Sequence, residues 1–265
     1  MGALVTANQK IGTVIHLLHG KRDELERMLP KHLTPDRLFR LTTSCMQDNP
    51  SLMRCTTISL CRAVMKSAQY GLELGGALGE AYLVPHKDVA VFYTGYRGLI
   101  KLALNSGKVA RIEACEVYDG DAFKYAKGTS PFIDHVPTTS DLRGDITHFY
   151  AIAFFPNGSF QFEVMEANDV WDIRDRCSKA KSSGPWKSDT VMMGRKTAIR
   201  RLATYLPLRS DILDLVKREE LVDLGIKHPS TLNKPDDNII DVTFKAVDEP
   251  DAPKMKATTV EDATD

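Results

Sequence analysis

The hydrophobic positions change their spacing about a third of the way along the chain, from the period of helices to that of strands. Ile11, Val14 and Leu18 share one face of a predicted helix that Gly20 ends. Thr34 followed by Pro35 is the pattern of a helix cap with proline in the first turn, which starts a second helix. The predicted helices of this part run from Ile11 to Gly20, from Thr34 to Asn49, and from Thr56 or Thr57 to Gly71.

Strand patterns dominate the middle of the chain. Phe160, Phe162 and Val164 alternate with polar residues directly after Asn157-Gly158, a dipeptide that accepts the positive φ angles of a tight hairpin turn. Residues 119–145, rich in Gly, Pro, Thr and Asp, are predicted to be a long loop. The expected strands are residues 81–85, 89–94, 109–118, 149–155 and 160–164, and the later helices are 96–105, one starting near 168, and 188–205.

These elements predict an α+β fold, in which a small antiparallel β-sheet with hairpins packs against helices. Residues 1–32 are expected to form a helical N-terminal segment and residues 33–218 the core. Residues 219–265 are expected to be an acidic, largely disordered tail. From about residue 227 this tail holds too few large apolar side chains to offset the entropy of ordering.

Charge is distributed unevenly, although 35 Lys and Arg balance 35 Asp and Glu over 265 residues. Residues 219–265 hold 5 basic and 12 acidic residues, a net charge of −7, so the preceding residues carry +7. Most of that excess lies in residues 174–218, with 12 basic and 4 acidic residues. A basic body with an acidic tail favours a polyanionic partner. The tail either competes with this partner for the basic residues or only keeps the protein soluble.

Several classes of protein are excluded by the sequence pattern. The longest apolar runs, such as Ala151 to Phe155, are far shorter than the roughly 18 residues of a membrane span, and no secretory signal is present. The five cysteines form no CxxC pair, which argues against a disulfide scaffold or a zinc module. We therefore expect a cytoplasmic protein.

Motifs of covalent catalysis are missing. There is no GxxxxGK[ST] phosphate loop and no GxSxG elbow, and the seven histidines lack metal-binding spacing. Residues 71–79 are interpreted as a flexible connection from helix to strand rather than as a phosphate loop. Asp119 and Asp121 suit a metal-dependent nuclease, but a solvated loop is the preferred interpretation. We expect no enzymatic activity, no metal and no cofactor.

Two predicted helices carry basic residues beside their apolar faces. At 100° per residue, Arg97, Lys101 and Asn105 form a row with members about 6 Å apart, which either follows a nucleic acid backbone or is a solvated helix edge. In the helix near residues 191–206, Arg195 falls inside the apolar arc and needs an acceptor, either an internal carboxylate or a phosphate. Lys196, Arg200 and Arg201 border that arc or point away from it.

Aromatic residues accompany these charges. Rings stack on bases regardless of sequence while Lys and Arg follow the backbone, so the combination favours single-stranded nucleic acid. Each ring taken alone fits a protein core as well. The positions concerned are Tyr93 and Tyr96 before Arg97, Phe123 and Tyr125 among Lys124 and Lys127, and Trp186 before Lys187.

Several of these segments together resemble the RecT family of single-strand annealing proteins. Their order and spacing match the family across roughly residues 33–216, whereas the first 30 residues and the acidic tail carry no matching run. The matching runs are residues 71–73 (GLE), 79–85 (GEAYLVP), 93–103 (YTGYRGLIKLA), 185–186 (PW), 195–202 (RKTAIRRL) and 205–207 (YLP).

The resemblance implies a phage or prophage recombinase that coats single-stranded DNA and pairs complementary strands without ATP. It also implies an α+β core that assembles into rings or helical filaments, with DNA in a basic groove. A 5′→3′ exonuclease and the host single-strand-binding protein are implied partners, in the bacterial host cytoplasm. The DNA-binding candidates carried over are Arg97, Lys101, Arg195, Lys196, Arg200 and Arg201, with Tyr93, Tyr96 and Trp186 assigned by position alone.

Two other functions stay open on the residues alone. A metal-dependent nuclease would use the acidic loop around Asp119 and Asp121 and would cut DNA when magnesium or manganese is added. A passive coat protein would bind single strands without ever accelerating their pairing.

Overall fold

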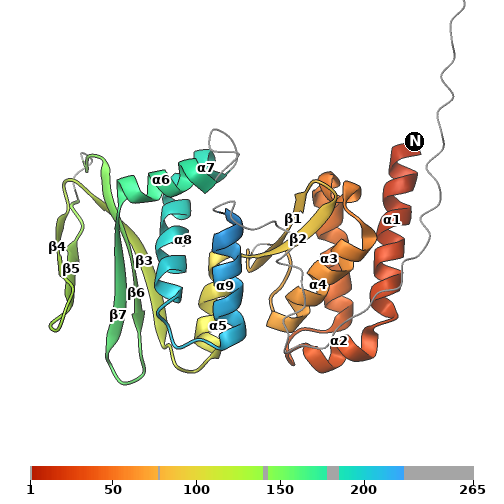
Figure 1. Ribbon diagram of the computed structural model, residues 1–265, viewed down its shortest axis with the longest axis horizontal. Coiled ribbons are helices and arrows are strands. Elements are labelled where there is room, and N and C mark those ends of the chain that lie inside the picture. The colour runs from red at the N-terminus through yellow and green to blue at the C-terminus, as the bar shows by residue number, and fades with distance from the viewer. Residues whose placement is uncertain (1, 77, 140–142, 178–184, 224–265) are drawn as a thin grey trace, which may run out of the picture.

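The computed structural model describes residues 2–76, 78–139, 143–177 and 185–223 and has helices at one end and a β-sheet at the other (Figure 1). This arrangement confirms the predicted α+β class. The helical end consists of α1 (Gly2–His19), α2 (Arg22–Met28), α3 (Pro35–Asp48), the short 3-10 helix η1 (Pro50–Arg54) and α4 (Thr57–Tyr70).

The ends of α3 and α4 follow the capping pattern of the sequence. The Thr34 hydroxyl accepts a hydrogen bond from the Arg37 amide at 3.3 Å, and the Thr56 hydroxyl accepts one from the Ser59 amide at 3.3 Å. Gly71 ends α4 with a φ of +64°, in the left-handed region that favours glycine. The three predicted helices are thus confirmed, while α2 and η1 were not predicted.

A hairpin joins this helical end to the rest of the chain. Strands β1 (Ala81–His86) and β2 (Val89–Thr94) pair antiparallel, as predicted, and α5 (Tyr96–Asn105) follows directly. A Cβ added at Gly95 would lie 2.0 Å from the carbonyl oxygen of Gly79, and one at Gly98 would lie 2.1 Å from that of Glu80. These two glycines therefore allow the start of α5 to pack directly on the backbone before β1.

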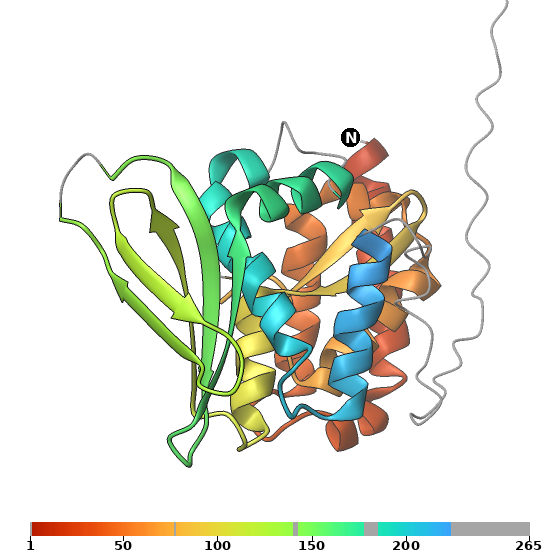
Figure 2. The same ribbon diagram turned by 60° about the vertical axis from the view of Figure 1, so that its left-hand side comes forward.

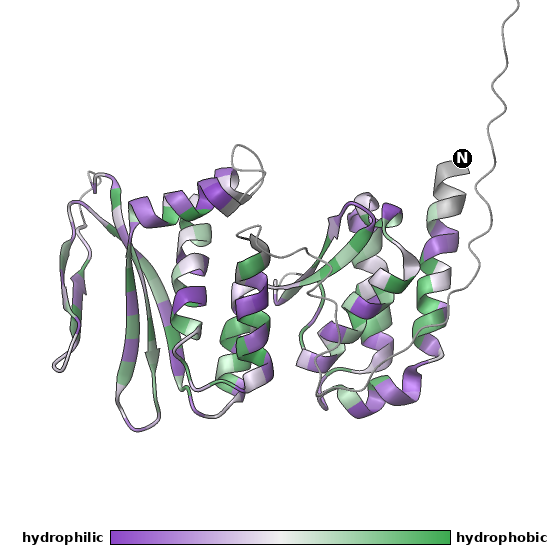
Figure 3. Ribbon diagram, viewed as in Figure 1, coloured by the Kyte–Doolittle hydropathy of each residue, from purple (hydrophilic) through white to green (hydrophobic). Residues whose placement is uncertain are grey.

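The larger sheet is antiparallel with the order β3-β6-β7, and its bounds are β3 (Arg111–Tyr118), β6 (Ile146–Phe154) and β7 (Phe160–Glu166). Helix α8 (Thr190–Ala203) packs on one face of this sheet. The contact is close, because a Cβ at Gly194 would lie 2.2 Å from the ring of Phe149. Hydrophobic and hydrophilic residues alternate along β7 (Figure 3), and the hairpin predicted at Asn157-Gly158 is confirmed.

The long loop predicted over residues 119–145 is wrong for part of its length. Strands β4 (Ala122–Ala126) and β5 (Phe132–Val136) form a separate antiparallel hairpin. Phe123 stacks on Tyr150 of β6, with ring centroids 5.7 Å apart, so the hairpin lies on the sheet face opposite α8 (Figure 2). These strands are short and contain no buried residue, so they lack the buried apolar positions from which strands are recognised.

The C-terminal part of the described chain is helical. It contains α6 (Ala167–Cys177), the single turn α7 (Pro185–Ser188), α8 and α9 (Ser210–Asp223), of which α7 and α9 were not predicted. The expected boundary between core and tail, 218/219, falls within α9, and the disorder expected from residue 227 lies outside the described residues. No helix in the described part is long and apolar enough to cross a membrane.

One continuous core connects the two ends of the molecule. It includes Val14 of α1, Phe92 of β2, Phe149 of β6 and Leu202 of α8, all almost fully buried. Ile212 and Leu215 of α9 belong to the same cluster. Helix α9 is therefore packed as part of the core.

Candidate nucleic-acid interface

The basic row on α5 is partly engaged within the protein. The Lys101 ammonium lies 2.7 and 2.9 Å from the two carboxylate oxygens of Glu80, the residue just before β1. Glu80 is buried, and its carboxylate also accepts a hydrogen bond from the Glu73 amide at 2.9 Å. Arg97 is exposed, and its Nε donates to the Tyr96 hydroxyl at 3.1 Å. Lys101 thus holds α5 to the residue before β1, whereas Arg97 faces solvent.

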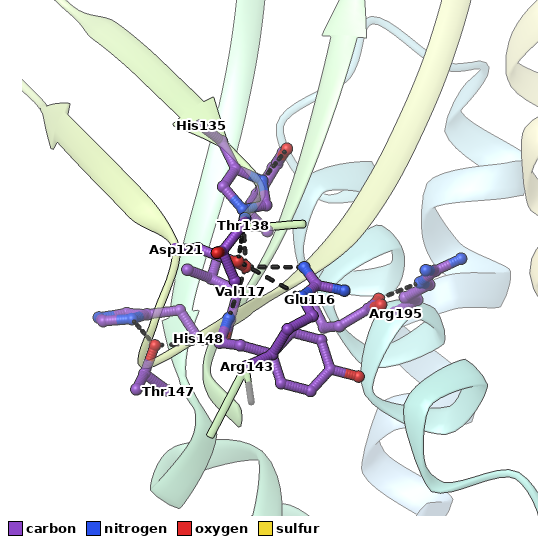
Figure 4. A network of polar contacts seen from close by, with 11 residues as sticks. Glu116, Val117, Asp121, His135, Thr138, Arg143, Thr147, His148 and Arg195 are labelled. Carbon is purple, nitrogen blue, oxygen red and sulfur yellow. Dashed lines mark hydrogen bonds and ion pairs between the residues drawn. The ribbon is translucent and has the colours of Figure 1, made fainter. Parts of the chain in front are cut away.

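Arg195 of α8 has an internal acceptor. Its Nε lies 2.6 Å from Oε2 of Glu116 in β3 (Figure 4). Burial by itself raises the pKa of Glu116, but the hydrogen bond and charge of Arg195, a backbone hydrogen bond and the charge of Arg143 together outweigh it. The pKa is therefore lowered, and this pair is ionised at neutral pH. Of the two acceptors considered for Arg195, the internal carboxylate is present, while the side chain stays 33% exposed.

The opposite edge of α8 faces a carboxylate from α9. Nη2 of Arg200 lies 3.5 Å from Oε2 of Glu219, and Oε1 of Glu219 accepts a hydrogen bond from the Thr94 amide at 2.7 Å. Burial raises the pKa of Glu219, and the charges of Arg200 and Lys196 and the hydrogen bond from the Thr94 amide offset this rise only in part. A single buried carboxylate therefore joins the end of β2 to the basic edge of α8.

Arg201 is placed differently from Arg195 and Arg200. Its side chain is exposed, and within residues 2–76, 78–139, 143–177 and 185–223 it has no ion-pair partner. An exposed guanidinium keeps all five donors available to a phosphate. Arg201 is therefore the α8 cation best placed to contact a ligand from solvent.

The two lysines of the β4 hairpin lie away from the helical cations. Lys124 is exposed and stands opposite Asp134 in the strand register. Lys127 lies 2.7 Å from Oε2 of Glu163 on β7. The hairpin covers the sheet face opposite α8 (Figure 2), so these lysines are separated from the α5 and α8 cations, which belong to two helices in contact.

The three aromatic candidates are partly packed. Tyr93 stacks on His86 within the β1–β2 hairpin, with centroids 5.7 Å apart. Tyr96 and Trp186 are half-buried and pack against the hydrophobic core. Each ring therefore has a structural contact in addition to any contact with a base.

Asp121 does not lie in a solvated loop, which corrects the interpretation from sequence. Its carboxylate is fully buried and accepts hydrogen bonds from the Tyr118 and Thr138 amides at 2.9 and 2.8 Å (Figure 4). It also lies 2.8 Å from Arg143 and 3.1 Å from Nε2 of His135.

These contacts fix the charge of Asp121. Burial acts to raise its pKa, but the hydrogen bonds from the amides, Arg143 and His135 together hold it well below its usual range. The second nitrogen of His135 lies 3.0 Å from the Tyr150 hydroxyl. Asp121 therefore fastens the β4–β5 hairpin to the sheet. In the part of the chain that is described, no group of three or more His, Cys, Asp or Glu is arranged to hold a metal ion.

Residues 71–79 connect α4 to β1, as the sequence predicted. Their four glycines all have positive φ angles of 59–68°. A Cβ at Gly75 would lie 2.6 Å from Sγ of Cys45. The glycines thus allow a left-handed backbone conformation and close packing, both of which a larger residue would hinder.

The acidic partners of the basic candidates were missed from sequence. Glu80, Glu116 and Glu219 are each distant in sequence from the cation that they bind, so no local spacing reveals the pairs. Glu80 alone carried a signal, because it lies in the run GEAYLVP. Glu219 was assigned to the acidic tail on composition.

Comparisons with known proteins place this geometry in context. Residues 36–234 match the family model described as RecT family. The chain is 35% identical over 235 residues to Protein RecT of Escherichia coli strain K12, covering 86% of this chain and 84% of that protein. It is 23% identical over 213 residues to the uncharacterized protein YqaK of Bacillus subtilis strain 168, covering 78% of this chain and 71% of YqaK.

Proposed function

The chain belongs to the RecT family of single-strand annealing proteins in recombination, and from that premise we propose that it binds DNA along the surface formed by α5 and α8. The observation that carries this proposal is the placement of Arg97 on α5 and of Lys196, Arg200 and Arg201 on α8, two helices that contact each other. Cations on neighbouring helices suit a phosphate backbone that runs across both.

Annealing on such a surface requires no nucleophile. Two DNA strands repel each other, and Lys and Arg lower that barrier while the counterions that they displace add favourable entropy. The bases of the two strands then test each other by pairing, so the protein needs no contacts to base edges. One chain offers only a few cations, so useful affinity requires many chains side by side.

Five of the cations on this surface divide into two groups. Lys101, Arg195 and Arg200 each lie beside a carboxylate, so their orientation is fixed and their charge is partly balanced. Arg97 and Arg201 are exposed. We assign the main phosphate contacts to the exposed group and a supporting role to the paired group.

Pairing of two complementary labelled oligonucleotides, with no nucleotide added, tests this function. The protein should accelerate duplex formation, and the acceleration should weaken as salt rises. Binding without acceleration would indicate a passive coat protein. Shortening of the strands in magnesium or manganese would indicate a nuclease.

The finer partner assignments belong to the same proposal. We assign an exonuclease and the host single-strand-binding protein as partners, and a ring or filament as the active assembly. They rest on the family resemblance and on the acidic residues after 223, which lie outside the described part of the chain. Co-purification with each partner, and electron microscopy of the protein on DNA, would test them.

A further inference from the structure

Helix α9 attaches to three parts of the molecule that are distant in sequence. The Tyr70 hydroxyl of α4 lies 3.4 Å from the carbonyl oxygen of Asp211 and donates to it. Ile212, Leu215 and Val216 are buried. Glu219 contacts both Arg200 of α8 and the backbone at the end of β2. Figure 1 shows α9 between α8 and the β1–β2 hairpin, and Figure 2 also shows α9 beside α8.

The two oxygens of Glu219 have separate partners. Oε1 accepts the Thr94 amide at 2.7 Å, and Oε2 faces Arg200 at 3.5 Å. Thr94 lies two residues before Tyr96 and three before Arg97. The same carboxylate thus fixes the backbone that begins α5 and the guanidinium on α8.

We propose that Glu219 is a positioning residue of the DNA-binding surface, which sets Arg200 and the start of α5 in register for one strand. This inference rests on the proposed function. It requires the contacts of the Glu219 carboxylate to help DNA binding, although a negative charge near phosphate would by itself oppose it. The sign of the effect therefore separates positioning from simple electrostatic competition.

The burial of Glu219 and of its neighbours on α9 indicates that Glu219 stays in place when DNA binds and is not displaced by it. Glu219 is 1% exposed, and the three apolar side chains on α9 would lose their burial if the helix moved away. A carboxylate that only imitated a phosphate would instead need to leave when DNA arrives. Arg200 stays 17% exposed, so the guanidinium can contact Glu219 and a phosphate at once.

The test uses the full chain and a fluorescent single-stranded oligonucleotide, with Glu219→Gln as the variant. Glutamine has only one acceptor oxygen. If that oxygen keeps the hydrogen bond from the Thr94 amide, the side-chain NH2 group faces Arg200, and two donors then face each other. We expect roughly fivefold weaker binding and a shallower salt dependence, because the Arg200 contact is lost. Asp214→Asn, an equal charge change at an exposed site of α9, is the matched control and should bind at least as tightly as wild type.

A double-mutant cycle with Arg200→Ala measures whether the losses in DNA binding are additive, which separates positioning of Arg200 from a general loss of stability. Positioning predicts that Glu219→Gln adds little once Arg200 is gone, whereas independent destabilisation predicts additive losses. Glu219→Asp keeps the charge but shortens the reach, and should also lose affinity. Tighter binding by Glu219→Gln, or wild-type binding by Glu219→Asp, would overturn the positioning role alone. A wild-type chain that ignores DNA would overturn the proposed function together with it.

Discussion

Lys101 and Glu80 form an ion pair in which the ammonium contacts both carboxylate oxygens, at 2.7 and 2.9 Å. The side chains are 24% and 9% exposed, so the pair lies mostly inside the protein. It ties α5 to the residue before β1, at the place where Gly98 already allows the backbones to approach. A residue selected as a DNA contact therefore also has a structural function.

Replacement of Lys101 by alanine should destabilise the fold. The change leaves the Glu80 carboxylate buried without its cation, which costs about 1–3 kcal/mol. Urea unfolding should show the loss, while Arg97→Ala, at an exposed site of the same helix, should leave the free energy of unfolding within about 0.5 kcal/mol of wild type. Equal stability of the Lys101 variant and wild type would show that the pair contributes nothing to folding.

Arg201→Ala should weaken DNA binding without a cost in stability. Removal of one phosphate contact should reduce the slope of log affinity against log salt by about 0.7 for each chain that binds. Arg209→Ala is the control, since Arg209 is 74% exposed and lies beside Asp211 outside the proposed surface. Titrations of an oligonucleotide at several salt concentrations measure both slopes, and identical slopes for the two variants would remove Arg201 from the interface.

Asp121 should make stability depend on acid pH. Its pKa is lowered in the folded protein, because hydrogen bonds outweigh the effect of burial. Its contribution is therefore complete above the ordinary aspartate pKa of about 4 and is lost as pH falls through the lowered folded value.

Asp121→Asn tests this dependence. The substitution should cost about 3 kcal/mol at pH 7, because a buried pair loses its anion, and less as pH falls well below 4. Urea unfolding at several pH values measures the difference between the two proteins. Asp119→Asn serves as the comparison, and a constant difference across pH would contradict the assigned role of Asp121.

The position of a C-terminal truncation should decide its effect. A chain that ends at residue 227 keeps α9 and Glu219, whereas one that ends at 218 loses both Glu219 and the last turn of the helix. The first should remain folded and bind DNA at least as tightly as the full chain at low salt, because acidic residues have been removed. The second should melt earlier and bind less tightly. Calorimetry and DNA titration distinguish the two, and equal behaviour would show that Glu219 and the last turn of α9 contribute to neither stability nor binding.

Much of the fold follows from local patterns in the sequence. Thr34, Thr56 and Gly71 mark helix ends because capping and left-handed backbone are local requirements, and Asn157-Gly158 marks a hairpin for the same reason. The β4–β5 hairpin was missed because its strands are short and mostly exposed. Helix α9 was missed because the acidic composition after residue 218 was taken to start the tail.

The basic side of the candidate site was predictable, and its acidic side was not. Arg195 showed that it needed an acceptor, because it stands inside an apolar arc. Which acceptor it finds depends on how α8 packs against β3, and Glu116 lies 79 positions away in sequence. Asp121 was misread for a similar reason, since its partners Arg143 and His135 come from later segments that fold back on it.

The hydrogen bond between Thr94 and Glu219 spans 125 positions of sequence. During synthesis from the N-terminus, the helical end, α5 and the sheet emerge before α9. The carboxylate that faces Arg200 leaves the ribosome only after nearly all of the core. In a nascent chain, Arg200 and the Thr94 amide therefore gain their Glu219 contacts only when the C-terminal helix docks.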